Sequence, residues 1–483
     1  MVEAPRELHG KSLIGYILGY FGIFMANMLV GTFIYQFYVY TINLNSLLTS
    51  VGVSFQLIIN AIFSIIAGIL ADNKKPGKFG KRRPFLLYGL PLWVLSSIII
   101  WFPPKCPQDN KLFLPTAIFL WINLIITAIA GASIISVHFS MLPEQSQTHK
   151  NREKIATATT FLTIIASGLA LMLPLIVQSI LPEPKNVKWW EPSGKIILNA
   201  IPLIGIFFTI FGLITMIITF FSVDESFHNS ANQQIRSSKI SLKEYFKQMV
   251  APFRDIKFRK YLGVRFTNGI SGKILGTIII PFLTYALLFK GPKFYIYVIV
   301  SFSSKFIGFY IWRKLLKKNS ILKTYKICIL AAVIASFMEI IFLIEGLSFE
   351  FVTVLFIITI GTVLGSMYGA VLFNPPLASL LIYEAADKEE ESDFEEAVSG
   401  ISGGYFGLSL FIMAMGQSFA SILIGVVLAG PNEKNPIIIT LTLSSMALFY
   451  LISLFFLSRI KLEEKFLKKE IIDVSEDNLF LKE

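Results

Sequence analysis

Long, nearly continuous apolar runs dominate the chain, and short polar segments separate them. Six runs precede a polar stretch at 223–260 and six follow it. The runs lie at 12–40, 47–71, 84–103, 112–142, 155–181, 196–222, 261–289, 294–312, 324–346, 350–383, 397–430 and 436–458. A helix needs roughly 20 apolar residues to cross a bilayer, and the runs lack the alternation of a transmembrane β-barrel. The pattern predicts an all-α integral membrane protein with twelve transmembrane helices.

The stretch 223–260 divides the predicted helices into two sets of six, and it has a pattern of its own. The spacing of Tyr245, Met249 and Phe253 favours an amphipathic helix on the membrane surface. The N-terminus is too polar for a cleaved signal peptide, so we expect the first span to stay. The predicted organisation is a six-helix bundle at 1–222, a cytoplasmic linker with a surface helix at 223–260, a second six-helix bundle at 261–460 and a cytoplasmic tail at 461–483.

Composition and charge agree with this pattern and indicate how the predicted helices are oriented in the membrane. Of the 483 residues, 54% are hydrophobic and 15% charged, and the mean hydropathy is +0.67, which excludes a soluble protein. One set of alternate loops, with both termini, carries 32 of the 43 Lys and Arg residues, the other loops carry 8, and 3 lie inside spans. Positive residues stay cytoplasmic, so we expect both termini inside, at the plasma membrane. The net charge of +12 indicates contact with anionic lipid, not nucleic acid.

Enzymatic signatures are weak along the whole sequence. The four His and two Cys residues are scattered, which predicts neither a metal site nor a cofactor site. The segment NGISGKILG lacks the glycine spacing and the Ser or Thr of a phosphate-binding loop. We therefore expect no enzyme. A transporter comes first, a receptor or channel second and a membrane-embedded enzyme third.

The loop after the second predicted span has a distinctive arrangement. In GILADNKKPGKFGKRRP, Gly68 and Asp72 are spaced as G-x-x-x-D, a short basic loop follows, and Pro84 opens the third span. This resembles the loop signature of the major facilitator superfamily, and RKLLKKNSILK at 313–323 is a degenerate counterpart in the second half. The resemblance implies a cytoplasmic latch to the opposite half made by Gly68, Asp72, Lys81, Arg82 and Arg83. The alternative is an ordinary positively charged loop.

Further stretches narrow the resemblance. They are the first span, SMLPEQSQTHKNRE after the fourth, and EEAVSGISGGYFGLSLFIMAMGQSFASILIGVVLAG in the eleventh. Together they resemble the glycoside-pentoside-hexuronide cation symporters, and KFGKRRPF is similar to the corresponding loop of sucrose transporters. The resemblance implies alternating access, in which two bundles expose a midplane site to one side at a time. It also implies a small solute, a sugar or glycoside, as the partner.

The residues that such symporters use for coupling are absent here. The family's second-span acids would fall at Asn60 and Ser64, the fourth-span acid near Ile135 and the first-span acid near Phe24. No Asp or Glu lies at 8–71, 110–143 or 256–338. A coupling ion, sodium or a proton, would therefore lack its usual ligands. We expect no sodium site, and either a uniporter or an exchanger.

Two polar helix faces survive in the first two spans. Gln56, Asn60, Ser64, Gly68 and Asp72 recur every four residues and share a helix face. Tyr20, Phe24, Asn27 and Gly31 make a comparable face in the first span. Such faces either line a cavity or pack helices together.

Intramembrane titratable groups complete the set of candidates. Lys273 lies near the middle of the seventh span, where a charge faces water or a partner, and it favours a solute with a carboxylate or phosphate. We expect Arg265 and Lys305 to snorkel rather than to bind a ligand, and Glu339 to snorkel or pack near the outer end of its span. His138 is either a packed side chain or a proton carrier. The candidate cavity residues are Tyr20, Phe24, Asn27, Gln56, Asn60, Ser64, His138, Asn268 and Lys273.

The tenth predicted span combines a small-residue stripe with a proline pair. Gly361, Gly365 and Gly369 predict close helix packing. The segment FNPPLAS predicts a helix break at Pro375 and Pro376, which would act as a flexible gate.

Overall fold

The structure is a computed structural model that describes residues 6–74, 77, 79–80, 82–225, 247, 249–387 and 394–463. Within these ranges its regular secondary structure is helical, with no strand and only an isolated bridge between Gly77 and Gly80. Eleven of the described helical segments are long and apolar enough to cross a membrane. The helix for the third predicted span, Arg83–Ile99, has 17 residues. The all-α fold class and its twelve helices are confirmed.

The chain divides into two compact units. Unit 1 comprises residues 1–242, 283–298 and 421–434, and unit 2 comprises 243–282, 299–420 and 435–483. Unit 1 thus includes two short segments from the second half of the sequence.

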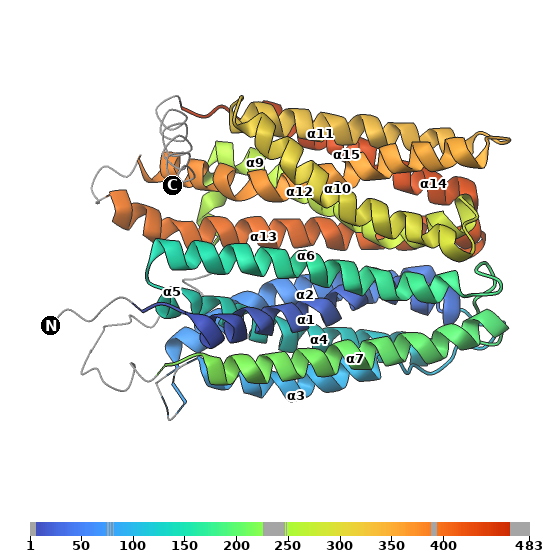
Figure 1. Ribbon diagram of the computed structural model, residues 1–483, viewed down its shortest axis with the longest axis horizontal. Coiled ribbons are helices and arrows are strands. Elements are labelled where there is room, and N and C mark those ends of the chain that lie inside the picture. Colours follow the sequence, from blue (N-terminus) through green and yellow to red (C-terminus); the bar gives the residue numbers. More distant parts are fainter. Residues whose placement is uncertain are drawn as a thin grey trace. The chain divides into compact units, whose positions relative to one another are not determined.

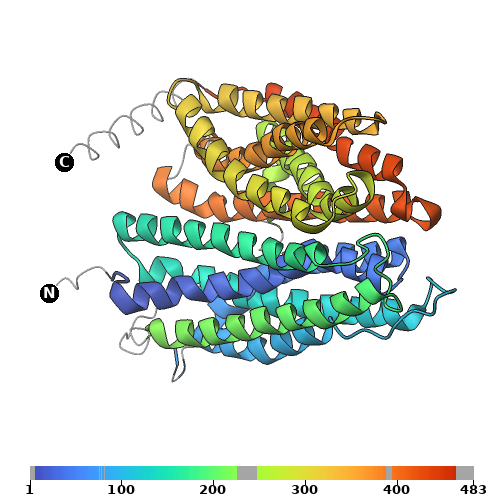
Figure 2. The same cartoon turned by 45° about the vertical axis from the view of Figure 1, so that its right-hand side comes forward.

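The helices of unit 1 lie side by side as a bundle (Figures 1 and 2). Their bounds are α1 Gly10–Tyr35, η1 Gln36–Thr41, α2 Ser46–Asn73, α3 Arg83–Ile99, α4 Leu114–Ser140, α5 Leu142–Gln145, α6 His149–Ser179 and α7 Pro192–Ser222. α1 packs against α6 and α7, and α4 against α2 and α3. α1 approaches α7 so closely that a Cβ on Gly22 would lie 2.8 Å from the Cα of Gly212. The small residues of these spans therefore allow the two backbones to meet.

Most of unit 2 is built from the second half of the sequence. The elements of this half are η3 Ala251–Arg254, α9 Ile256–Pro281, η4 Phe282–Ala286, η5 Gly291–Lys293, α10 Phe294–Leu316, α11 Ile321–Met338, η6 Glu339–Leu343, α12 Phe349–Ala386, α13 Phe394–Val427, η7 Gly430–Lys434, α14 Pro436–Ser444 and α15 Met446–Ser458. Of these, η5 and η7 belong to unit 1, and η4, α10 and α13 are shared between the two units. α9 and α11 both pack against α15, and α11 packs against α12. The predicted surface helix of the linker falls mostly on residues outside the described ranges.

The glycines of α12 pack closely, as their stripe predicts. A Cβ on Gly308 of α10 would lie 2.6 Å from the Cα of Gly365, and Trp312 donates its indole N–H to the Gly365 carbonyl at 3.0 Å. The predicted helix break is wrong, because α12 continues through both prolines. The hydroxyl of Tyr261 donates to the Asn374 carbonyl at 3.2 Å and that of Ser379 to the Pro375 carbonyl at 3.1 Å. These bonds tie the proline segment to α9 and to its own next turn, whereas the carbonyls that lose their helical donors are those of Val371 and Leu372.

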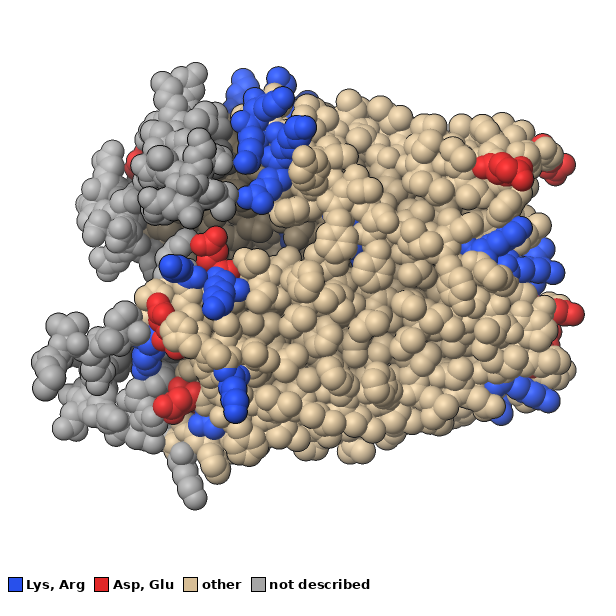
Figure 3. All heavy atoms as spheres, viewed as in Figure 1, with Lys and Arg blue, Asp and Glu red and all other residues tan. Residues whose placement is uncertain are grey.

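Charged side chains gather near the helix ends on the face drawn in Figure 3, and the surface along the middle is largely uncharged. On α7, Leu203, Phe207, Ile210 and Ile214 point outward and are exposed. An outward apolar face of this length is what a helix presents to lipid.

Candidate functional site

The predicted polar face of α2 is partly open. Gln56, Asn60, Ser64 and Gly68 are each intermediate in exposure. The hydroxyl of Ser64 donates to the Asn60 carbonyl at 2.8 Å, and Ser136 of α4 donates to the Ser64 carbonyl at 2.6 Å. The side-chain amides of Gln56 and Asn60 have no hydrogen-bond partner among the described residues. Ser64 therefore contributes to helix packing, whereas the two amides have no such role among the described residues.

The predicted face of α1 divides in the same way. Tyr20 and Phe24 are partly exposed, with ring centroids 5.5 Å apart. Asn27 accepts a hydrogen bond from the indole N–H of Trp93 on α3 at 3.3 Å, which binds two helices together. Gly31 is exposed, and a Cβ there would meet open space. Asn27 thus acts at least partly in packing.

His138 of α4 is enclosed by aromatic rings. Its side chain is 1% exposed and stacks on Tyr16, with ring centroids 4.3 Å apart. The Tyr16 hydroxyl donates to the His138 carbonyl at 2.8 Å. Of the two interpretations, this geometry favours a packed histidine.

Asn268 belongs to a buried hydrogen-bond network within unit 2. Its amide N–H donates to the Tyr325 hydroxyl at 2.7 Å, and Ser453 donates to its Oδ1 at 3.2 Å. Tyr325 in turn donates to Asn374 Oδ1 at 3.1 Å. The sequence alone did not point to Tyr325, Asn374 and Ser453, because three separate helices bring them to α9. The polar Asn374 within the proline segment was the available signal.

The cations inside the spans have different surroundings. Lys273 is partly exposed, and its ammonium has no ion-pair or hydrogen-bond partner in the part of the chain that the structure describes. Lys305 is 6% exposed, with its ammonium 5.2 Å from the Tyr368 ring centroid. Arg265 is 9% exposed and donates from Nε to Ser409 Oγ at 3.0 Å. Snorkelling of Lys305 and Arg265 is therefore wrong: both are buried inside unit 2.

The predicted latch is described only in part. Lys81 and the side chain of Asp72 lie outside the described residues. Arg83 donates from Nε to the Phe220 carbonyl at 3.0 Å, and Arg82 donates to the Ser140 carbonyl. Both backbone amides also donate to the buried Glu225 carboxylate, at 2.9 and 3.1 Å. These contacts fix the start of α3 within unit 1.

A buried ion cluster that the sequence did not reveal closes the opposite end of unit 1. Glu433 of η7 is 3% exposed and pairs with Lys111 and, at 3.1 Å, with Lys188. Lys188 also donates to the Val39 carbonyl at 3.0 Å, and the Tyr40 hydroxyl donates to the Glu433 carbonyl at 2.8 Å. Burial lowers the pKa of the Lys188 ammonium to about 8, although Glu433 opposes the shift. In the sequence these residues are ordinary loop charges.

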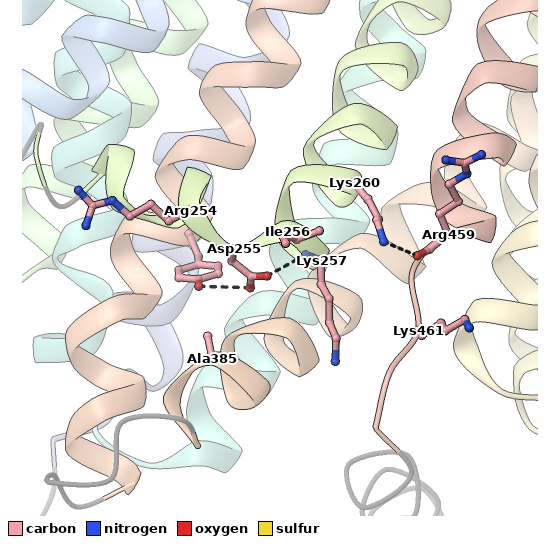
Figure 4. Close-up of a pocket in the computed structure, with 9 residues that line it drawn as sticks. Arg254, Asp255, Ile256, Lys257, Lys260, Ala385, Arg459 and Lys461 are labelled. Carbon is pink, nitrogen blue, oxygen red and sulfur yellow. Dashed lines mark hydrogen bonds between the residues drawn. The ribbon is translucent and has the colours of Figure 1, made fainter.

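A basic pocket of about 740 Å³ lies at the predicted cytoplasmic end of unit 2 (Figure 4). Its cationic lining residues are Arg254, Lys257, Lys260, Arg459 and Lys461. Asp255 caps α9, accepting from the backbone N–H of Lys257 at 2.8 Å, and Lys257 pairs with Glu384. None of the candidate cavity residues lines this pocket. Its charge matches the excess of positive residues predicted for cytoplasmic loops.

Within the described ranges, no group of three His, Cys, Asp or Glu side chains is placed to hold a metal ion. The carboxylates that are buried there lie far apart in the sequence and have separate partners or none.

Comparisons with solved structures find transporters that share this fold. The nucleoside transporter NupG matches with a TM-score of 0.62 at 12% identity, over 94% of this chain and 100% of that chain. A D-xylose-proton symporter matches with a TM-score of 0.59 at 13% identity, over 92% of this chain and 96% of that one. A bacterial homologue of the human lysosomal transporter Spinster matches with a TM-score of 0.62 at 11% identity, over 95% and 97%.

Sequence comparisons add the family. Among curated proteins, none matches this chain. The family model described as "MFS/sugar transport protein" matches residues 15–464, which is nearly the whole chain. The resemblance that the loop signature indicated is thereby confirmed, and the chain belongs to the MFS/sugar transport proteins, a family of the major facilitator superfamily.

Proposed function

We propose that this protein carries a small polyhydroxylated solute, a sugar or a nucleoside, across the plasma membrane by alternating access. The family match over residues 15–464 is the observation that carries the proposal. The family and the fold are those of transporters rather than enzymes. Two solved proteins of the same fold are named as a nucleoside transporter and a D-xylose-proton symporter.

The partly exposed polar side chains suit such a solute. Gln56 and Asn60 keep amides without a partner among the described residues, and Tyr20 places a hydroxyl on a partly open face. Amides and hydroxyls both donate and accept hydrogen bonds, and a few such groups in an apolar site give specificity for a hydroxylated ligand. The excess of Lys and Arg in one set of loops supports cytoplasmic termini.

Lys273 favours a second candidate, a solute that bears a carboxylate or a phosphate. An ammonium without a partner inside a span is expensive, and an arriving anion would neutralise it. Sodium coupling is not part of the proposal, because a hard cation needs carboxylates or a dense cage of oxygens. Asn60 and Ser64 offer only neutral oxygens.

A thermal-shift screen of the purified protein against sugars, nucleosides and organic anions will identify solutes that bind. Each stabilising solute is then tested for counterflow in proteoliposomes. We expect saturable counterflow for a sugar or a nucleoside. Binding without counterflow would indicate a receptor, and conductance far above the turnover of a carrier would indicate a channel.

A further inference from the structure

Glu339 is a buried acid in the middle of an apolar environment. It begins η6, directly after α11, inside the candidate span Ile321–Leu343. Its side chain is 0% exposed, and neither carboxyl oxygen has a hydrogen-bond partner among the described residues. Of the two alternatives expected for this residue, snorkelling and packing, the burial contradicts snorkelling.

The other buried carboxyls of the described residues show how unusual this is. There are three: Glu225, Glu384 and Glu433. Glu225 accepts backbone amides, Glu384 pairs with Lys257, and Glu433 pairs with Lys188. Buried charges in proteins are paired in this way, whereas an ionised carboxylate without a partner is neutralised by a proton. Among these four, Glu339 is the one that lacks the partner its ionised form would need.

Unpartnered hydroxyls lie around Glu339. Ser336 precedes it by one helical turn, and its buried hydroxyl has no partner among the described residues. Tyr450 of α15 lies beside Ser271 of α9 and within electrostatic range of Glu339, yet neither hydroxyl completes a hydrogen bond. Several unsatisfied polar atoms in one buried region require a functional or structural explanation, such as an ordered water or a catalytic or ionic role.

No cation of the described elements is bonded to the Glu339 carboxyl. On α11, Lys323 and Lys326 lie in the first turns, 16 and 13 residues before Glu339. η6 packs against α11, α12 and α14, and α14 has no titratable residue. On α15, the titratable group that faces Glu339 is the Tyr450 hydroxyl, with Cys328 of α11 also near Tyr450. Glu350, in the first turn of α12, is exposed and so does not share the buried position of Glu339. Neither Glu339 oxygen accepts a hydrogen bond from Lys273 of α9.

We propose that Glu339 is a proton-binding site, loaded in this conformation, whose release of the proton in another conformation couples transport to a proton gradient. The inference rests on the proposed carrier function. Loading forms one O–H bond between a carboxylate oxygen and a proton from the aqueous phase on one side. Unloading breaks that bond and returns the proton to the other side.

The coupling follows from the difference between the two protonation states. The neutral carboxyl tolerates the buried position, whereas the carboxylate favours a conformation in which water or a partner reaches it. A ligand shifts a conformational equilibrium by its differential affinity for the two states, and here the ligand is the proton. Unit 2 would thus supply a proton-coupling residue, although the positions of the family's coupling acids are occupied by Asn60 and Ser64.

Infrared spectroscopy of the full-length protein in nanodiscs tests proton binding without any solute. We expect a carbonyl band of a protonated carboxylic acid at neutral pH in the wild type. Glu339→Gln should remove this band, and Glu345→Gln, at an exposed loop position shortly after η6, should keep it. A wild type without the band, or a Glu339→Gln variant that retains it, would overturn the proposal.

Proteoliposomes test the coupling, with radiolabelled uridine and D-xylose as probes. At one proton per solute, an imposed gradient of about one pH unit should drive about tenfold accumulation. Glu339→Gln should reduce accumulation to about onefold while counterflow continues, and Glu339→Asp should retain part of it. Proton-driven accumulation by Glu339→Gln would contradict the coupling. Absence of counterflow in the wild type with both probes would instead count against the proposed function, and the infrared result would still decide proton binding.

Discussion

At the scale of single residues, the charged groups inside the spans differ in their exposure and in whether they have interaction partners. Lys305 and Arg265 are buried against aromatic and hydroxyl partners. Lys273 is partly exposed and has no partner among the described residues. Burial alone therefore does not identify a residue that binds solute. We propose that access combined with an unmatched charge marks such a residue, and Lys273 is the candidate with both.

Replacement of this ammonium should affect anionic solutes selectively. Loss of one charge-assisted hydrogen bond removes about 1.5–3 kcal/mol, so Lys273→Gln should reduce uptake of a carboxylate- or phosphate-bearing solute by about tenfold or more. Lys273→Arg should retain most of the uptake, and a neutral solute serves as the internal control. Equal transport of the anion by wild type and Lys273→Gln would refute a role for Lys273 in recognition.

Lys188 should make stability depend on pH in a defined direction. Its pKa is about 8 in the folded protein, below the ordinary value of 10.5. Between these two values the unfolded chain binds more protons than the folded one, so stability rises with pH through this group. Melting temperatures measured from pH 7 to 10 should show a more positive slope for wild type than for Lys188→Met. Identical slopes would show that Lys188 titrates normally.

At the scale of helices, the close approach of the α10 and α12 backbones leaves no room for side chains. A Cβ on Gly308 would meet the Cα, carbonyl carbon and oxygen of Gly365 rather than a flexible side chain. The two helices must therefore separate to accommodate any larger residue. By contrast, a Cβ on Gly276 of α9 would meet open space.

This contrast gives a matched pair of alanine variants. Gly308→Ala should destabilise the protein by about 1–3 kcal/mol, as overpacking does. Gly276→Ala should stabilise it by about 0.5–1 kcal/mol, since glycine weakens a helix interior. Thermal unfolding in detergent will compare the two, and a Gly308→Ala variant as stable as wild type would show that α10 and α12 are less tightly packed.

The sequence predicted the helices better than their surroundings, for a physical reason. Hydropathy is a local property, so runs such as 196–222 identify a span without knowledge of its neighbours. The break at Pro375 was predicted wrongly because the effect of a proline on a transmembrane helix depends on neighbouring helices, and α9, which contacts this segment through Tyr261, is distant in sequence. The burial of Glu339 likewise depends on α14 and α15, which are distant in sequence.

At the scale of the whole molecule, the loop signature and the carrier fold imply a change of conformation. The resemblance assigns Asp72 to a cytoplasmic latch with the opposite half of the chain. The described contacts of Arg82 and Arg83 already fix the start of α3. Asp72 would then be the member of the signature that changes partners.

Asp72→Asn should therefore slow transport and shift the resting conformation while solute affinity on the accessible side stays nearly the same. Cysteine accessibility on the two membrane faces, measured together with solute binding, will test this. Asp109→Asn, at an exposed position of the α3–α4 loop, is the matched control. Unchanged accessibility in Asp72→Asn would count against a latch.

The ion cluster around Glu433 has a consequence for biogenesis. Lys188 and its carboxylate partner are 245 residues apart in sequence, and both belong to unit 1. A ribosome that has released residues 1–242 has therefore made the first set of membrane helices but not the segment that closes their end. Until residues 421–434 emerge, the Lys188 ammonium and the Tyr40 hydroxyl lack their partner Glu433. Unit 1 is therefore completed only when residues 421–434 have been synthesised. We expect the folding of a separately expressed 1–242 fragment to depend on chaperones or on co-expression of the remainder.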